Sequence, residues 1–280
     1  MTSGSSSNDA IVAGLRNLLR KEVPSQFAGT LRISPYGTDL DPWQESVLDT
    51  KTKNQILNCA RQVGKSTVVA IKALHRAVFR EEQLVLIIAP SLRQSQELFK
   101  KVLYYGRQVA DIPDKTEDNQ LSLAFTNGSR IVSLPGSPKT VRGYSGASLV
   151  IIDEAAFAEK GLFAAVMPMI SVSDGDMMLL STPNGKMGFF WDAWSKGGAD
   201  WEKYEIPWWK CPRHSEERLM AHKSVIGDYQ FSVEYECQFR DAQDAVFSYE
   251  DIMNAFGDVD TLYKPGEGFM ISDEVEVLQL

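Results

Sequence analysis

A nine-residue segment that begins at Cys59 has the residue types and spacing of a nucleotide-phosphate loop. It reads Cys-Ala-Arg-Gln-Val-Gly-Lys-Ser-Thr and lies between an expected strand (54–58) and a segment with helical spacing of apolar residues (67–79). Backbone N–H groups at such a junction point toward an anion, Lys65 can reach the outer phosphates, and the Ser66 hydroxyl can ligate Mg2+. Cys59 stands where the pattern has its first glycine, and a chance Gly-Lys-Ser in a surface turn is the alternative.

Two carboxylates follow an apolar run farther along the chain. The run from Leu149 to Ile152 is apolar throughout, as expected of a central parallel strand buried on both faces, and it ends in Asp153 and Glu154. We expect Asp153 to hold the water shell of Mg2+ opposite Ser66, and Glu154 to act as general base toward the water that attacks the γ-phosphate. An acidic strand end that only caps the next helix is the alternative. Because both motifs occur in this order, we predict a nucleoside-triphosphate site.

The composition is typical of an enzyme core in a reducing compartment. With 280 residues and 44% hydrophobic content, the chain can bury one large domain, alone or with a small appendage. Its three cysteines are widely spaced and odd in number, which argues against a disulfide framework. No apolar run approaches the ~20 residues that span a bilayer. The formal charge of −8 does not indicate a nucleic-acid binder and does not exclude one, because a DNA-tracking surface can be local.

Strands and helices alternate along the chain, and this pattern predicts an α/β fold with a mostly parallel sheet. The serine-rich residues 1–7 are expected to be flexible. Asp41 is the expected N-cap of a helix that starts at Pro42, and Asn127-Gly128 indicates a two-residue hairpin turn. The other expected elements are helices at 9–22 and 92–109, a helix from the end of the 149–153 strand to about 170, a hairpin over 121–134, and strands at 83–89, 149–153 and 177–180.

Three motifs resemble those of the large terminase subunit of tailed bacteriophages, namely residues 60–66, 151–156 and 180–185. The Arg-Gln-x-Gly-Lys-Ser form of the loop, without its first glycine, is typical of that family rather than of ordinary P-loop enzymes. The resemblance extends from Trp43 to about Phe247 and includes 229–239, which resembles the helix near the end of the family's ATPase region. It implies a P-loop NTPase of the ASCE type, with a mostly parallel central sheet flanked by helices and a small helical lid subdomain.

The resemblance also implies an activity and partners. The chain is expected to hydrolyse ATP with Mg2+ and to drive double-stranded DNA into a viral procapsid. The expected partners are the portal protein and procapsid, the small terminase subunit and further copies in a pentameric ring, with no membrane, in the host cytoplasm and outside the mature virion. A helicase-like DNA-remodelling ATPase and a nucleotide-gated portal-docking protein with little turnover are the alternatives. Glu154 favours turnover, because a pure switch needs no base.

Matching positions receive roles from the family. Trp43 and Gln44 resemble the element that contacts adenine, and a helix-capping tryptophan in the core with a solvent-facing glutamine is the alternative. Arg61 resembles a residue that senses the γ-phosphate or binds a carboxylate that signals the nucleotide state, with a surface salt bridge as the alternative. Ser181 and Thr182 resemble the motif that couples hydrolysis to movement, or else form a plain strand exit. The complete ATP-binding set is Trp43, Gln44, Arg61, Gln62, Val63, Gly64, Lys65, Ser66 and Thr67, and the expected metal ligands are Ser66 and Asp153.

Arg142 lies in a glycine-punctuated segment upstream of the 149–153 strand. The matching family segment supplies an arginine to the ATP site of a neighbouring subunit, where its charge stabilises the transferred phosphoryl group. The resemblance therefore adds Arg142 to Lys65 and Glu154 as a catalytic residue. A contact to a DNA phosphate and a solvated loop arginine are the alternatives.

The pattern of elements and the resemblance divide the chain into four parts. They are an N-terminal tail and helix (1–40), the ATPase core (41–204), a lid subdomain (205–262) and a linker or tail (263–280). Large terminases continue into an RNase H-like nuclease, for which this chain leaves no room, so no DNA cutting is expected of it. Cys211, His214, His222 and Cys237 fall within the lid range without the paired spacing of a zinc site.

Overall fold

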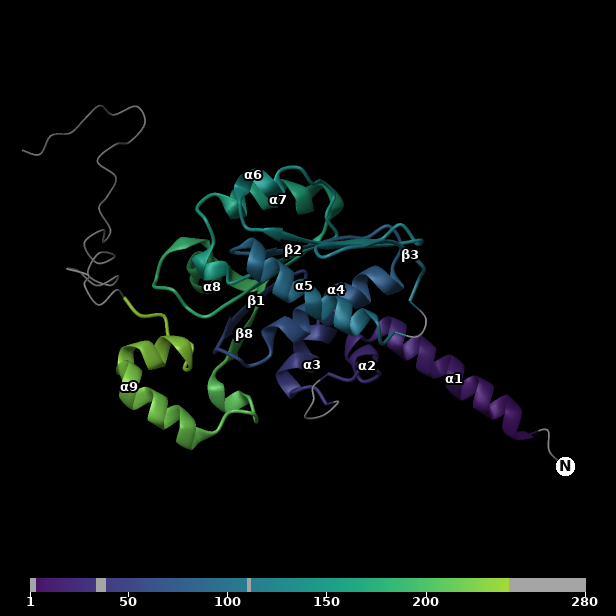
Figure 1. Cartoon of the computed structure of the whole chain (residues 1–280), viewed down its shortest axis with the longest axis horizontal. Helices are drawn as coiled ribbons and strands as arrows, with labels where there is room; N and C mark the ends of the chain where they lie inside the picture. The colour runs from purple at the N-terminus through teal and green to yellow at the C-terminus, as the bar shows by residue number, and fades with distance from the viewer. Residues whose placement is uncertain (1–3, 34–38, 110–111, 242–280) are drawn as a thin grey trace, which may run out of the picture. The chain divides into compact units, whose positions relative to one another are not determined.

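An eight-stranded sheet lies at the centre of the structure, a computed structural model that describes residues 4–33, 39–109 and 112–241 (Figure 1). Its strand order is β3-β4-β5-β2-β6-β7-β1-β8. The strands from β5 onward in this order are parallel, and β4 and β3 are antiparallel additions at one edge. The predicted mostly parallel sheet is confirmed. The bounds are β1 Asn54–Cys59, β2 Leu84–Ala89, β3 Lys115–Asp118, β4 Ser122–Phe125, β5 Arg130–Pro135, β6 Leu149–Asp153, β7 Asp176–Ser181 and β8 Trp201–Ile206.

Helices cover both faces of the sheet, which explains why its central strands are apolar at successive positions. Successive side chains of a strand point to opposite faces, so Leu57 and Ile56 of β1 belong to two separate core clusters. The cluster around Leu57 packs under α2 Pro24–Ala28, α3 Pro42–Asp49, α4 Lys65–Phe79 and α5 Leu92–Gly106. The cluster around Ile56 packs under α6 Pro138–Val141, α7 Leu162–Ser173 and α8 Gly188–Lys196.

The N-terminal helix is longer than the sequence pattern predicts. Helix α1 spans Gly4–Glu22 (Figure 1), whereas its expected start is residue 9. The expectation of a flexible segment is therefore wrong for residues 4–7, because no proline interrupts the helical backbone there, and residues 1–3 lie outside the described residues. Its side chains Leu15, Leu18 and Leu19 are exposed.

The predicted hairpin is present, but its loop has three residues rather than two. Strands β4 and β5 pair antiparallel, the N–H of Phe125 donates to Ser129 O (2.9 Å), and the N–H of Gly128 donates to Phe125 O (3.1 Å). Gly128 has φ 81°, the left-handed backbone that closes a three-residue loop. The side-chain amide of Asn127 donates to Ala77 O at the end of α4 (2.9 Å), and this tertiary contact favours the longer loop.

The segment after β6 differs from the expected continuous helix. A 3₁₀ turn covers Ala155–Phe157, and α7 begins only at Leu162. The two are separated because Ala158 has an extended backbone (φ −70°, ψ 151°), which no helix tolerates. Helix α5 likewise ends at Gly106 instead of 109. Strand β3 is exposed throughout and consists of three charged residues and a threonine, so no apolar pattern would predict it.

Residues after 204 continue the same compact unit, which runs through Arg240. Strand β8 extends to Ile206 and pairs in parallel with β1, and helix α9 Glu216–Glu234 follows, with a non-helical backbone at Gly227. The helix predicted for 229–239 therefore ends five residues early. The lid subdomain at 205–262 stays a prediction, and its residues 242–262 lie outside the described residues, as does the linker or tail at 263–280.

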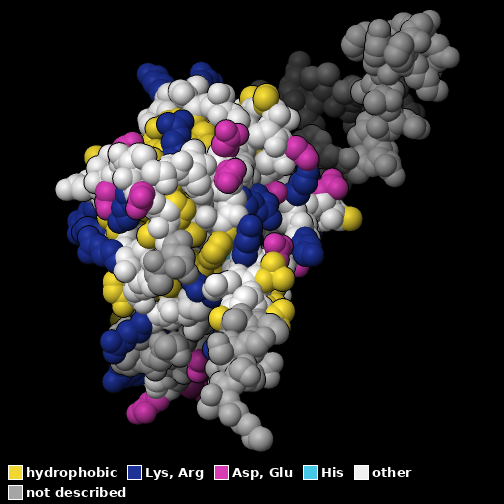
Figure 2. All heavy atoms as spheres, turned by 90° about the vertical axis from the view of Figure 1, so that its right-hand side faces the viewer, with side chains coloured by type: hydrophobic (Ala, Val, Ile, Leu, Met, Phe, Trp, Pro, Cys, Tyr) yellow, Lys and Arg dark blue, Asp and Glu magenta, His cyan; other side chains and the backbone are white. Residues whose placement is uncertain are grey.

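The described helices include none with the length and apolar character needed to cross a bilayer. On the face shown in Figure 2, basic and acidic side chains are interspersed rather than gathered by sign.

The burial of the central strands can be tested by comparing the same substitution, valine to alanine, at a buried and at an exposed position. Val150 on β6 is fully buried, whereas Val172 on α7 is 84% exposed. We expect Val150→Ala to lower the free energy of unfolding by about 2 kcal/mol, because it removes buried methyl groups and leaves a cavity. Val172→Ala should change it by less than about 0.5 kcal/mol. Denaturant unfolding of both variants gives the comparison, and equal effects would contradict the described sheet.

Candidate active site

The phosphate loop joins the end of β1 to the start of α4. Cys59, the last residue of β1, is fully buried, and burial raises the pKa of its thiol to about 12. Its backbone is that of a strand, so the position has no need of a glycine. Gln62 (φ 58°) and Gly64 (φ 103°) take the left-handed conformation instead. A β-carbon at Gly64 would also lie 2.7 Å from Nε2 of Gln44, so a side chain there would be both strained and obstructed.

Lys65, the first residue of α4, meets Glu154, which directly follows β6. Lys65 Nζ lies 2.9 Å from Glu154 Oε1, and the Ser181 hydroxyl donates to Glu154 Oε2 (3.3 Å). Burial opposes the charge on Lys65, but the carboxylates of Glu154 and Asp153 outweigh it and raise the pKa of Lys65 above its ordinary value. The structure therefore brings together three of the residues that the sequence singles out, from β6, β7 and α4.

Asp153 lies beside this pair and is partly exposed to solvent. Burial raises the pKa of its carboxyl to about 6, although the charge on Lys65 opposes the shift, and its Oδ1 accepts a hydrogen bond from the N–H of Glu154 (3.1 Å). Glu154 has φ 49°, a left-handed backbone that costs a non-glycine residue on the order of 1 kcal/mol and recurs at active sites. Ser66 stands in the first turn of α4. A carboxylate and a hydroxyl fit Mg2+, which takes few protein oxygens and completes its shell with water and phosphate.

Trp43 and Gln44 begin α3 beside the phosphate loop. Trp43 is buried, as the alternative for this pair expects, and its indole N–H donates to Asp41 Oδ2 (3.3 Å). Gln44 is buried as well, so the solvent-facing glutamine of that alternative is wrong. Gln44 Oε1 accepts the N–H of Asp41 (2.9 Å), while its Nε2 faces Gly64. The expected N-cap at Asp41 is thus confirmed, and Gln44 stands against the loop. Their contact with adenine stays a prediction.

Arg61 makes an ion pair with Glu234 of α9, an arrangement that fits both a surface salt bridge and a carboxylate contact that signals the nucleotide state. Arg61 Nε bonds Glu234 Oε2, and its Nη2 lies 3.1 Å from Glu234 Oε1. The side chain of Arg61 is 59% exposed, so the pair adds little stability on its own. Val63 and Thr67 are buried, and the N–H of Thr67 donates to Gly64 O (3.0 Å). Sensing of the γ-phosphate by Arg61 stays a prediction.

Arg142 ends helix α6 and is exposed. It lines a hollow of about 380 Å³ with Tyr144, Pro168 and Met169, and neither Lys65 nor Glu154 contributes to that hollow. The structure therefore does not bring Arg142 into the site of its own chain. This placement agrees with all three roles considered for it, a contact to a neighbouring subunit included.

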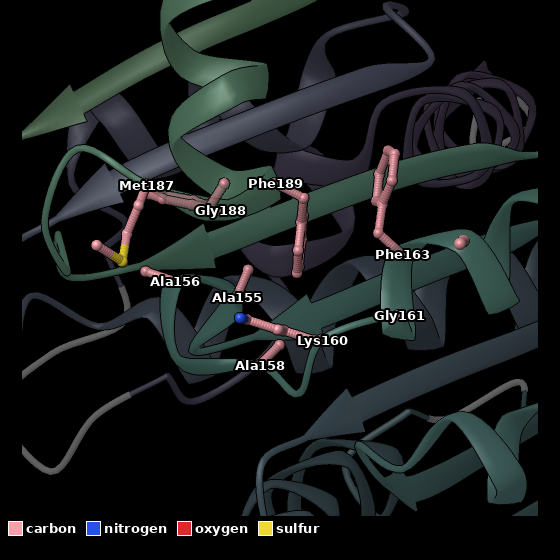
Figure 3. Close-up of a pocket in the computed structure, with 11 residues that line it drawn as sticks. Ala155, Ala156, Ala158, Lys160, Gly161, Phe163, Met187, Gly188 and Phe189 are labelled. Carbon is pink, nitrogen blue, oxygen red and sulfur yellow. The ribbon is translucent and has the colours of Figure 1, made fainter. Parts of the chain in front are cut away.

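Ser181 and Thr182 are both buried where β7 ends. The loop that follows is tied to the loop after β6, because the amide of Asn184 donates to Ala156 O (3.2 Å). Beside this contact lies an open, mostly apolar hollow of about 290 Å³ (Figure 3), lined on one side by residues 155–164, up to the start of α7, and on the other by Met187 and the start of α8. The segment after Glu154 and the segment after Ser181 are thus in contact, and both line this hollow.

Arg213 and His214 lie near the loop, and no sequence signal would have assigned them to this place. Arg213 donates to both carboxylate oxygens of Asp41 and to Val63 O (3.0 Å). His214 Nε2 lies 3.1 Å from Arg61 O. In sequence they belong to a Cys-Pro-Arg-His segment that suggests, if anything, metal ligands. No set of three or more candidate ligands converges within the described ranges.

A family model decides the relationship of this chain to known proteins. The model "Terminase large subunit, T4likevirus-type, N-terminal" matches residues 56–253. The chain belongs to the large terminase subunits. Terminase large subunits of Thermus virus P23-45 and Thermus phage G20c are 27% and 26% identical to it, over 75% of this chain and 50% of each relative. This terminase chain therefore spans about half the length of the curated relatives it matches.

Solved terminase structures share the fold. The ATPase domain of the Thermus phage P74-26 large terminase has a TM-score of 0.64 at 23% identity, and the match covers 75% of this chain and all of that domain. The HK97 bacteriophage large terminase has a TM-score of 0.65 at 18% identity, over 79% of this chain and 55% of its own. The large terminase of a thermophilic bacteriophage in complex with ADP has a TM-score of 0.61 at 9% identity, over 71% and 54%. The predicted P-loop fold is confirmed.

The carboxyl of Asp153 should make stability fall as pH rises, because the folded chain raises its pKa. The folded chain raises the pKa of this group from 3.8 to about 6, so it holds a proton that the unfolded chain has already released between these values. Its stabilising contribution is complete below pH ~4, and it is lost as pH rises through ~6. Asp153→Asn lacks this transition, so its advantage over the parent should grow by about 2 kcal/mol across that window and then stay constant.

Urea unfolding at several pH values, in the presence of EDTA, measures this difference. The exposed Asp200→Asn is the matched control and should follow the parent at every pH. A constant difference between Asp153→Asn and the parent from pH 4 to 7 would contradict the inference.

Proposed function

We propose that this chain is an ATPase whose turnover drives double-stranded DNA into a viral procapsid. The observation that carries the proposal is the contact of Lys65 in the phosphate loop with Glu154 at the end of β6, with Ser181 bonded to the same carboxylate. Membership in the large terminase subunits supports the DNA-packaging role, and structures of a terminase with ADP and with ATP-gamma-S support the nucleotide.

The residues divide the reaction between them. The triphosphate would replace Glu154 as the ion-pair partner of Lys65, because the phosphates carry more negative charge than one carboxylate. Glu154, released from the ion pair, would then orient the attacking water and accept its proton. Ser66 and Asp153 would hold Mg2+, which neutralises phosphate charge when it is bound. Ser181 would lose its acceptor as Glu154 moves, and the segment after Thr182 would respond to that change.

The proposed partners follow from the family. They are double-stranded DNA, portal protein and procapsid, the small terminase subunit, and further copies of the chain in a pentameric ring, in the host cytoplasm. ATPase activity measured with and without portal and procapsid tests the motor against a nucleotide-gated docking protein, which would show little turnover in either condition. Strand displacement from a forked duplex would instead favour the helicase-like alternative.

Glu154→Ala should leave ATP binding intact and lower the rate of hydrolysis by ~10²-fold or more, because the variant lacks the positioned base. Lys65→Ala should instead lose nucleotide affinity. Glu159→Ala removes an exposed carboxylate from the loop that follows and serves as the matched control, with turnover near that of the parent. Steady-state phosphate release and equilibrium binding of a labelled nucleotide measure the two effects, and near-normal turnover of Glu154→Ala would remove the residue from its role.

Arg142 is proposed to complete the site of a neighbouring copy. Specific activity should then rise with protein concentration, or on addition of portal, because single chains lack the final positive charge. Arg142→Ala should abolish this rise and still bind ATP, and mixing it with Glu154→Ala should restore part of the activity. Arg107→Ala, which removes an exposed arginine at the end of α5, should behave as the parent. Specific activity that is independent of concentration and portal in all variants would exclude the role in trans.

A further inference from the structure

Arg213 connects Asp41, the N-cap of α3, to Val63 in the phosphate loop. It lies in the turn before α9, Nη1 donates to Asp41 Oδ1 (2.9 Å), and Nη2 donates to Asp41 Oδ2 (2.6 Å). The same Nη2 donates to Val63 O inside the phosphate loop (3.0 Å). A planar guanidinium holds both ends of such an arrangement at fixed angles, which a lysine ammonium does not.

Asp41, held in place by Arg213, in turn fixes the orientation of the Gln44 side chain. Its carboxylate is 6% exposed and accepts from Arg213 and from the indole of Trp43, and its N–H donates to Gln44 Oε1 (2.9 Å). The amide of Gln44 is 3% exposed, and its Nε2 is packed against Gly64. Oxygen and nitrogen of this amide therefore have assigned directions, and the carbonyl oxygen keeps a second lone pair for another donor.

An amide of fixed direction distinguishes adenine from guanine. Adenine presents an amino donor and a ring-nitrogen acceptor on one edge, whereas guanine presents two acceptors there. An amide whose oxygen faces the base can accept a hydrogen bond from the amino group of adenine. An amide that is free to rotate by 180° could instead donate from its nitrogen to the carbonyl of guanine. Holding Asp41 in place removes that second orientation, because the N–H of Asp41 needs the oxygen of Gln44.

The contact with Val63 acts on the phosphate side of the site. The carbonyl of Val63 and the N–H of Gly64 belong to one planar peptide unit, so a bond that holds the carbonyl also fixes the direction of the N–H. N–H groups of this loop are the expected donors to the phosphates. One guanidinium thus orients both the base-side amide and a phosphate-side peptide.

We propose that Arg213 is a positioning residue that sets the preference of this site for adenine nucleotides, through Asp41 and Gln44 on the base side and Val63 on the phosphate side. The inference rests on the proposed ATPase function, and it assigns a specificity-determining role to a residue from the segment after β8. Arg213 is expected to touch no reacting atom. Its loss should therefore raise KM and relax base selection, with a small effect on kcat at saturating ATP.

Arg213→Lys tests the role with the charge retained. The ratio of kcat/KM for ATP over that for GTP should fall about tenfold or more, mostly through KM for ATP, while kcat with ATP stays within about threefold of the parent. Arg218→Lys, which changes an exposed arginine in the first turn of α9, is the matched control and should keep the parent's ratio. Equilibrium binding of ADP and GDP by the same variants gives a second reading that needs no turnover.

A double variant separates base selection from stability. Arg213 compensates a buried carboxylate, so its replacement alone can destabilise the chain. Arg213→Gln with Asp41→Asn removes both charges together, and it should show the same loss of ADP-over-GDP preference with a thermal midpoint close to that of the parent. An unchanged preference in Arg213→Lys and in the double variant would overturn the proposal, even with a lowered midpoint. So would a parent that binds both nucleotides equally. A parent that hydrolyses no ATP but prefers ADP to GDP would remove the proposed function and leave the role of Arg213 standing.

Discussion

The ion pair between Lys65 and Glu154 depends on three strands that end at one level. Strand β7 lies between β1 and β6, Asn58 of β1 is in register with Ser181, and Asp153 of β6 is in register with Leu180. The residue after each strand therefore emerges at the same edge, and Ser181 stands between the phosphate loop and Glu154. A shift of one residue on β6 would move its end by about 3.3 Å and turn every side chain to the opposite face. The continuous apolar cores on both faces of the sheet are what exclude such a shift.

The phosphate loop is also held from the segment that follows β8. Ile206 O accepts the N–H of Ala60 (2.9 Å), and Glu234 O accepts the N–H of Arg61 (2.9 Å). With Arg213 on Val63 O and His214 on Arg61 O, four contacts join residues 206–234 to the backbone of Ala60, Arg61 and Val63 in one loop. A loop bonded in this way has few independent conformations, so a change at the phosphates and a change in the segment before and within α9 are mechanically linked.

Local constraints were readable from the sequence, and contacts between distant segments were not. Gly64 and Lys65 could be placed because a phosphate loop needs particular residues at fixed spacing, and Asp153 could be placed because a buried strand ends there. The ion pair of Arg61 with Glu234 joins two residues far apart in the chain, and although the loop pattern marks Arg61, no local pattern marks Glu234 as its partner. The extra loop residue of the β4–β5 hairpin has the same origin, since it accommodates a contact of Asn127 with α4. Residue spacing carries information about local structure, whereas these contacts depend on which distant segments the order of the strands brings together.

The cysteine at the start of the phosphate loop gives this chain a built-in reporter. All three cysteines are buried and free, and burial raises the pKa of the thiols of Cys59 and Cys237. Thiolates are the reactive form, so a thiol-reactive dye can modify the folded chain only as fast as it opens. Cys237 lies over the end of β1, where its carbonyl accepts the amide of Asn58 (2.7 Å), so two of the three reactive positions adjoin the nucleotide loop. The rates at which a dye labels Cys59 and Cys237 therefore measure how often the chain opens around this loop.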